Sequence, residues 1–230
     1  EERHAWRSTV TVVAWPLAEL GAALVRRTRR LVRLSPASVA LGLRLDGSEP
    51  GIGRVWLRQV RLTVPADDPL AAVDHPDVEV VDDEARLLRL MASDLVQLVE
   101  PVVDAVRPHA GTGRRGLWGG VLDCLVHPFS EPAPDDAGSG GQRRRVDALL
   151  AACAGTPLDQ RPTWVELEYD GRTVATLRKT ACCLAYEWPA DMHPGRADGC
   201  DPTWDRYCFA CPLIPEAETV HRSRYWLSHG

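Results

Sequence analysis

Lysine is almost absent from this chain of 230 residues, whose 27 basic side chains include a single lysine, Lys179. The 32 acidic residues outnumber the basic ones, and the formal net charge is −5. Proteins that bind nucleic acid through its phosphates present a strongly basic surface, so the composition argues against a nucleic-acid partner. We attribute the scarcity of lysine mainly to genome composition.

Long apolar runs are also missing from the sequence. None approaches the roughly 18 residues needed to cross a bilayer. The most apolar segment, Val10–Val25, is interrupted by Pro16 and Glu19. It also lacks the charged start, apolar centre and small-residue cleavage site of a signal peptide. We therefore expect a cytoplasmic protein without stable membrane insertion.

Apolar residues recur at helical spacing in several segments. This periodicity predicts helices over residues 1–34, 84–106, 116–127 and 142–154. Asp82 or Asp83 is suited to cap the second of these helices. Residues 129–141 have the composition of a flexible linker.

Alternating apolar residues predict strands in two other parts of the chain, residues 39–64 and 163–188. Asp170-Gly171 is a strong hairpin signal within the second part. We expect these strands to form one antiparallel sheet with helices packed around it, in an α+β fold. Residues 1–162 would form the larger α+β region. Residues 163–230 would add the hairpin and a cysteine-rich segment to the same integrated domain.

Cysteine is the residue type that carries the strongest functional signal. The chain has seven cysteines, of which five lie between residues 182 and 211: Cys182, Cys183, Cys200, Cys208 and Cys211. An odd count and the absence of an export signal argue against a disulfide framework. In a reducing compartment, clustered thiols more often bind metal or carry out redox chemistry.

The spacing of these cysteines is typical of a metal centre. Cys208 and Cys211 form a C-x-x-C motif, whose short loop lets two thiolates meet one metal, and the adjacent Cys182 and Cys183 are the natural second pair. Neighbouring side chains of a strand point to opposite faces, so a shared centre requires strand pairing to fail at or just after Cys182. Arg178 and Lys179 could offset part of the negative charge of such a centre.

The residues alone leave three interpretations open. Four thiolates can hold an iron–sulfur cluster or a structural zinc ion, and the thiols could also be free or joined in disulfides. Two cysteine pairs are a more specific signal than a lone C-x-x-C motif. We favour the iron–sulfur cluster, because an adjacent pair is unusual for zinc.

Two segments carry a resemblance to a known family. The segment RKTACCLAYEW (178–188), followed by CFACPL (208–213), resembles the C-terminal cluster motif of FhuF-like ferric-siderophore reductases. The segment GRRGLWGGV (113–121) is more weakly similar to another part of that family. The resemblance implies a [2Fe–2S] cluster, which passes one electron to a ferric siderophore and is reloaded by an external donor such as a ferredoxin or a flavin reductase. It assigns the cluster ligands to Cys182, Cys183, Cys208 and Cys211.

The chain departs from the family pattern in its spacer. Residues 184–207 separate the two cysteine pairs by 24 positions, and they include Cys200. In the family the two pairs lie closer together. Cys200 could therefore replace Cys182 or Cys183, although both halves of the motif are complete without it.

A candidate substrate contact lies at the start of the third expected helix. Arg114 and Arg115 would present cations near a helix N-terminus, which attracts anionic groups, and Trp118 could pack against an apolar ligand face. The alternative is a solvated basic turn beside a core tryptophan. Cys124 and Cys153 lie within expected helices and are better explained as buried small side chains than as ligands.

Two other functions remain open at this point. The chain could be a binding module without redox activity, in which zinc ties the C-terminal segment to the sheet. It could also keep the cluster and serve as an electron carrier or accessory protein in a siderophore-like biosynthesis.

Overall fold

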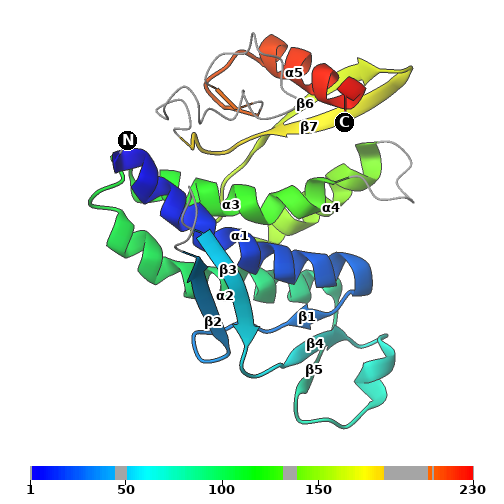
Figure 1. Ribbon diagram of the computed structural model, residues 1–230. Coiled ribbons are helices and arrows are strands. Elements are labelled where there is room, and N and C mark those ends of the chain that lie inside the picture. Colours follow the sequence, from blue (N-terminus) through cyan, green and yellow to red (C-terminus); the bar gives the residue numbers. More distant parts are fainter. Residues whose placement is uncertain (1, 45–50, 132–138, 184–206, 209, 230) are drawn as a thin grey trace.

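The computed structural model describes residues 2–44, 51–131, 139–183, 207–208 and 210–229. These residues form helices and several small sheets, which confirms the expected α+β class (Figure 1). The helices are α1 (Glu2–Thr28), α2 (Glu84–Val106), α3 (Arg114–Ser130), α4 (Ser139–Ala152) and α5 (Glu216–His229).

The helix predictions hold best where caps and periodicity agree. Helix α2 has the predicted bounds, and Asp83 caps it by accepting the N–H of Arg86 at 2.7 Å. Helix α1 ends at Thr28, before the predicted boundary, and α3 runs on to Ser130, into the stretch predicted as linker. Helix α5 was not predicted. It begins directly after Pro215, a residue type that favours helix starts.

The main core lies among the first four helices. Helix α1 packs against α2 and α3, and α4 packs against α2 and α3. Each contributes fully buried apolar side chains, among them Leu17, Leu87, Leu122 and Leu149. Burying an apolar side chain of this size contributes about 1.5–3 kcal/mol, so this helical layer is the stable frame of the fold.

Helix α1 contradicts the expectation that the chain has no apolar segment long enough to cross a membrane. Its segment Ala5–Thr28 is long and apolar enough to do so by length and composition. A signal sequence or the core helix of a soluble protein passes the same test. In the structure, Val10, Ala14 and Val25 of this helix are buried in the helical core.

The strands form three separate sheets within the described residues. In the first, β2 (Val39–Arg44) pairs antiparallel with β3 (Gly51–Leu57). In the second, β4 (Leu62–Pro65) pairs antiparallel with β1 (Leu31–Val32) and parallel with β5 (Val78–Val81), which follows the short 3₁₀ helix η1 (Pro69–Ala72). In the third, β6 (Thr163–Tyr169) pairs antiparallel with β7 (Arg172–Arg178).

The expectation of one antiparallel sheet from residues 39–64 and 163–188 is therefore wrong. The helical layer lies between the β6–β7 hairpin, which α5 covers, and the strands of the N-terminal half (Figure 1). The predicted second strand of residues 39–64 also breaks after Leu57 and resumes as β4. Alternation of apolar residues predicts strands, but it does not say which strands pair.

The β6–β7 hairpin has the predicted turn. Asp170 and Gly171 both have positive φ angles, 50° and 69°, as a two-residue type I′ turn requires. Pairing runs from Tyr169–Arg172 to Thr163–Arg178 and then stops. The backbone beyond Arg178 is free to leave the sheet, and this is the segment that leads to the adjacent cysteines.

Candidate metal centre

The two cysteine pairs come from different parts of the fold. Cys182 and Cys183 follow β7, and Cys208 and Cys211 precede α5. The C-x-x-C segment is a tight turn, since the N–H of Cys211 donates to the carbonyl oxygen of Cys208 at 3.0 Å. Strand pairing ends four residues before Cys182, so the alternation of a strand does not separate the thiols of Cys182 and Cys183.

The two pairs contact one another through sulfur. The Cys208 thiol is hydrogen-bonded with Cys183 and with Cys211, and the Cys211 thiol is hydrogen-bonded with Cys182 and Cys208. Contact with Cys183 lowers the pKa of Cys208, whereas contact with Cys211 and burial raise it, and the net direction is upward. For Cys211, contact with Cys182 raises the pKa most, and the net direction is again upward.

The four thiols contact one another two at a time. None of the cysteines described by the structure is in a disulfide. In the same described residues, no group of three or more histidine, cysteine, aspartate or glutamate side chains could hold a metal ion as it stands. The absence of such a group is compatible with the thiol contacts. The four sulfur atoms lie near one another, but they are not arranged around one common point.

Backbone contacts join the two cysteine segments. The N–H of Lys179 donates to the carbonyl oxygen of Ala210 at 2.9 Å, and Ala210 lies within the C-x-x-C turn. The Arg178 guanidinium donates to the carbonyl oxygens of Pro212 at 2.9 Å and Ile214 at 2.5 Å. The end of β7 therefore fixes the C-x-x-C turn beside the adjacent pair.

A buried arginine of α5 holds the other side of that turn. Arg222 is 1% exposed, and it donates to the carbonyl oxygen of Tyr207 and to the carboxylate of Glu218, each at 2.6 Å. Tyr207 directly precedes Cys208. The role of Arg222 could not be predicted, because helix α5 itself was not.

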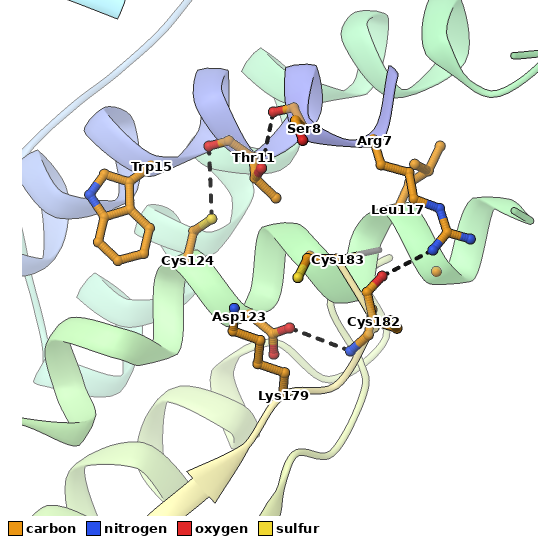
Figure 2. Close-up of a pocket in the computed structure, with 13 residues that line it drawn as sticks. Arg7, Ser8, Thr11, Trp15, Leu117, Asp123, Cys124, Lys179, Cys182 and Cys183 are labelled. Carbon is orange, nitrogen blue, oxygen red and sulfur yellow. Dashed lines mark hydrogen bonds between the residues drawn. The ribbon is translucent and has the colours of Figure 1, made fainter. Parts of the chain in front are cut away.

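Two residues of the helical layer hold the segment before Cys183. Asp123 of α3 accepts the backbone N–H of Thr180 at 2.7 Å and that of Ala181 at 3.4 Å. Arg7 of α1 donates to the carbonyl oxygen of Cys182 at 3.0 Å and to that of Ala110 at 3.2 Å. Figure 2 shows both side chains reaching this segment, Arg7 from α1 and Asp123 from α3. Neither Asp123 nor Arg7 belongs to a motif that predicts this role.

Burial and neighbouring charges shift the pKa of two groups here. Burial raises the pKa of Asp123 to about 6, against the opposing effect of the N–H groups of Thr180 and Ala181. Burial lowers the pKa of Lys179, but Cys208, Cys183 and Asp123 raise it, and the net direction is upward. Lys179 therefore keeps its positive charge beside the thiols.

A cavity of about 210 Å³ adjoins the adjacent cysteine pair. Its wall is mainly apolar, with charged groups at Arg7, Asp123 and Lys179. Trp15 of α1 lies on its rim, half-exposed, and Cys182 and Cys183 lie on its wall (Figure 2). A small group that enters this cavity would touch the cysteine segment directly.

The predicted substrate residues lie elsewhere. Arg114 is exposed and pairs with Glu100 and with Asp104. Arg115 is exposed, and its carbonyl oxygen accepts a hydrogen bond from Gln160 at 2.9 Å. Trp118 is 1% exposed within the helical core. None of the three side chains lines the cavity beside the cysteines.

The remaining cysteines divide into two groups. Cys124 and Cys153 are buried, as expected, and burial raises the pKa of each thiol to about 12. At neutral pH they are protonated and poor nucleophiles. Cys200, the possible substitute ligand, lies outside the described residues.

Comparisons with family models, curated proteins and solved structures find no match to this chain. The fold and the centre therefore have to be interpreted from the chain's own residues. The resemblance to FhuF-like reductases rests on the cysteine motif with its flanking residues and, more weakly, on residues 113–121.

Proposed function

We propose that the chain is a cytoplasmic [2Fe–2S] protein that reduces ferric siderophores. The observation that carries this proposal is the meeting of both cysteine pairs, in which each C-x-x-C thiol contacts one thiol of the adjacent pair. Four thiols are the donor set that such a cluster requires, so Cys182, Cys183, Cys208 and Cys211 would hold it. The nearby Lys179 and the partial burial of the thiols also suit a thiolate-bound cluster.

The chemistry follows from the preferences of iron. Siderophore oxygens are hard donors that hold Fe(III) much more tightly than Fe(II). When bound, the cluster supplies one electron to Fe(III), which becomes Fe(II) and leaves its chelator readily. An external ferredoxin or flavin reductase would replace that electron. The mainly apolar cavity beside Cys182 and Cys183 gives part of the ferric complex a place to approach the centre.

The chain's own residues supply orientation. Asp123 and Arg7 fix the backbone of residues 180–182, while Arg178 and Arg222 fix the two ends of the C-x-x-C turn. These contacts come from four different elements, which limits how far the two cysteine pairs can separate. Orientation of this kind keeps a metal centre at one position relative to a substrate.

The first experiment is anaerobic purification, followed by a visible spectrum and measurement of iron, sulfide and zinc. About two iron and two sulfide per chain, with colour bleached by dithionite, would support the proposal. Reduction of ferric siderophores can then be followed with a chelator that is coloured with Fe(II). A cluster without this activity would favour an electron carrier or an accessory protein in a siderophore-like biosynthesis.

Variants test the ligand assignment. Cys208→Ala and Cys182→Ala should each abolish colour and activity, whereas Cys153→Ala should keep both, because Cys153 is buried in the helical core. Cys200→Ala decides whether that residue is a ligand. Full activity in a colourless Cys208→Ala protein would contradict the proposal. A colourless wild-type protein with one zinc, even after attempted cluster reconstitution, would favour a zinc-stapled binding module.

A further inference from the structure

Lys179 is the only lysine of the chain, and its backbone is hydrogen-bonded to the C-x-x-C turn. It lies one residue beyond β7 and three residues before Cys182. Its N–H donates to the carbonyl oxygen of Ala210, inside the C-x-x-C turn, at 2.9 Å. This contact fixes the backbone of Lys179 beside the C-x-x-C turn.

The side chain of Lys179 enters the cavity that the adjacent cysteines line. Figure 2 shows it running alongside Asp123, and Cys183 lines the same cavity. The groups that act on it electrostatically are Cys208, Cys183, Asp123 and Cys124. Two of these four groups belong to the proposed ligand set, one from each cysteine pair.

The arginines around the centre have other roles. The Arg178 guanidinium is engaged with the carbonyl oxygens of Pro212 and Ile214. Arg7 is engaged with the carbonyl oxygens of Cys182 and Ala110. Both hold backbone in place, whereas Lys179 shares a cavity wall with Cys182 and Cys183 and interacts electrostatically with Cys208 and Cys183. A compact ammonium suits this position, because a point charge does not need the planar, bidentate partner that a guanidinium prefers.

Charge near a thiolate centre changes its redox balance. A cluster bound by four thiolates is negative, and it gains one more negative charge on reduction. A fixed cation nearby therefore stabilises the reduced form more than the oxidised form and raises the reduction potential. The carboxylate of Asp123 opposes this effect in part. Hydrogen bonds from two backbone N–H groups offset some of its negative charge.

We propose that Lys179 is the counter-charge of the cysteine centre: it strengthens metal binding by the four thiolates and raises the potential at which the centre accepts an electron. The electron comes from an external ferredoxin or flavin reductase and passes on to Fe(III), so no proton or bond to Lys179 is involved. The effect on potential rests on the proposed function. The effect on metal binding does not, because it applies to any divalent metal held by the same thiolates.

Two measurements on the full chain test the inference, with Lys179→Met, Lys179→Arg and the exposed control Arg172→Gln. The first is the midpoint potential of the anaerobically reconstituted cluster. Lys179→Met should lower it by at least a tenfold change in the reduction equilibrium, which is 59 mV for one electron. Lys179→Arg keeps the positive charge and should keep the potential close to that of the wild type. Arg172→Gln should also leave the potential near wild type.

The second measurement is the affinity of the metal-free protein for Co²⁺, followed by its thiolate absorption. Lys179→Met should weaken it at least tenfold, and Lys179→Arg should weaken it much less. If Lys179→Met changes neither potential nor affinity, the inference is wrong while the proposed function stands. If Co²⁺ affinity depends on Lys179 in this way but the wild type takes up no cluster, the inference stands and the reductase proposal fails. If it takes up neither, both fail.

Discussion

The carboxylate of Asp123 accepts the backbone N–H of Thr180 at 2.7 Å, across 57 residues of sequence. This hydrogen bond links helix α3 of the core to the segment that carries Cys182 and Cys183. Because burial raises the pKa of Asp123 to about 6, the linking group changes its charge in an accessible pH range. The attachment of the cysteine segment is therefore open to a simple thermodynamic test.

We predict that Asp123 makes the metal-free protein less stable as the pH rises from about 4 to 7. The folded-state pKa, about 6, lies above the ordinary aspartate pKa of 3.8, so the folded state binds this proton more tightly. The resulting stabilisation is fully present below about pH 4 and is lost as the pH rises through about 6. Relative to Asp123→Asn, the free energy of unfolding should fall by on the order of 2–3 kcal/mol.

Urea unfolding at several pH values between 4 and 7 measures this difference. The exposed control Asp147→Asn should keep the pH dependence of the wild type, because Asp147 lies on the outer face of α4. Parallel curves for the wild type and Asp123→Asn would show that the Asp123 carboxyl titrates as it does in the unfolded chain.

Arg7 gives a second prediction, because it ties the first helix to the Cys182 carbonyl oxygen. Arg7→Ala removes this bond and the one to Ala110, and we expect a loss of about 1–2 kcal/mol in the free energy of unfolding. Bound metal should also be lost faster to a chelator. Arg27→Ala, at the exposed end of the same helix, should leave both quantities near wild type. Equal metal retention in the two variants would show that Arg7 does not position the cysteine segment.

The parts of the centre that sequence analysis predicted depend on local signals. Asp170-Gly171 specifies its own turn, and Cys208 and Cys211 are close because only two residues separate them. Arg7 and Asp123 carry no such signal. Arg7 meets the Cys182 carbonyl oxygen from 175 positions away, and neither residue has a spacing that points to the cysteines. Such contacts exist only once the helical layer and the β6–β7 hairpin have packed together.

In the fold, too, local features were predictable and long-range contacts were not. Helix α2 was predictable because its cap and its apolar stripe agree. The single sheet was wrong, because alternation fixes which face of a strand is apolar and leaves its partner open. In the β2–β3 and β6–β7 hairpins each strand pairs with its neighbour in sequence, so the two hairpins form without being joined.

Trp118 provides a third prediction, which separates a core role from the substrate contact suggested by the sequence. Its side chain is 1% exposed, and its Nε1–H has no hydrogen-bond partner among the described residues. Trp118→Phe removes this unpaired donor and keeps most of the apolar volume, so it should cost at most about 1 kcal/mol. Trp118→Ala should cost about 3–5 kcal/mol through the cavity that it leaves.

Kinetics complete the test of Trp118. If the residue is only part of the core, Trp118→Phe should reduce ferric siderophores with wild-type kcat and KM. A folded Trp118→Phe protein with a clearly raised KM would restore the interpretation of Trp118 as a substrate contact. Arg114→Gln serves as a companion variant, since it removes only exposed ion pairs, which are worth less than about 1 kcal/mol.

The last prediction concerns the close approach of the cysteine segment to helix α3 at Gly119. A Cβ atom added to Gly119 would lie 2.8 Å from the Cβ of Ala181 and 3.2 Å from Oε1 of Gln160. Alanine normally stabilises a helix interior relative to glycine by about 1 kcal/mol. Here Gly119→Ala should instead destabilise the protein and weaken metal retention, because the segment before Cys182 must move outward.

The double variant Gly119→Ala/Ala181→Gly isolates this contact. Removing the Ala181 Cβ eliminates the shorter clash, so metal retention should return towards wild type, with a non-additive gain that a double-mutant cycle measures. Gly140→Ala is the matched control, because its added Cβ would meet only Nη1 of Arg144, at 3.5 Å. If Gly119→Ala binds metal as well as Gly140→Ala does, the cysteine segment does not depend on its seat against α3. Metal retention in the double variant then has nothing to restore, and the thiols are held by Arg7 and by the C-x-x-C side of the centre.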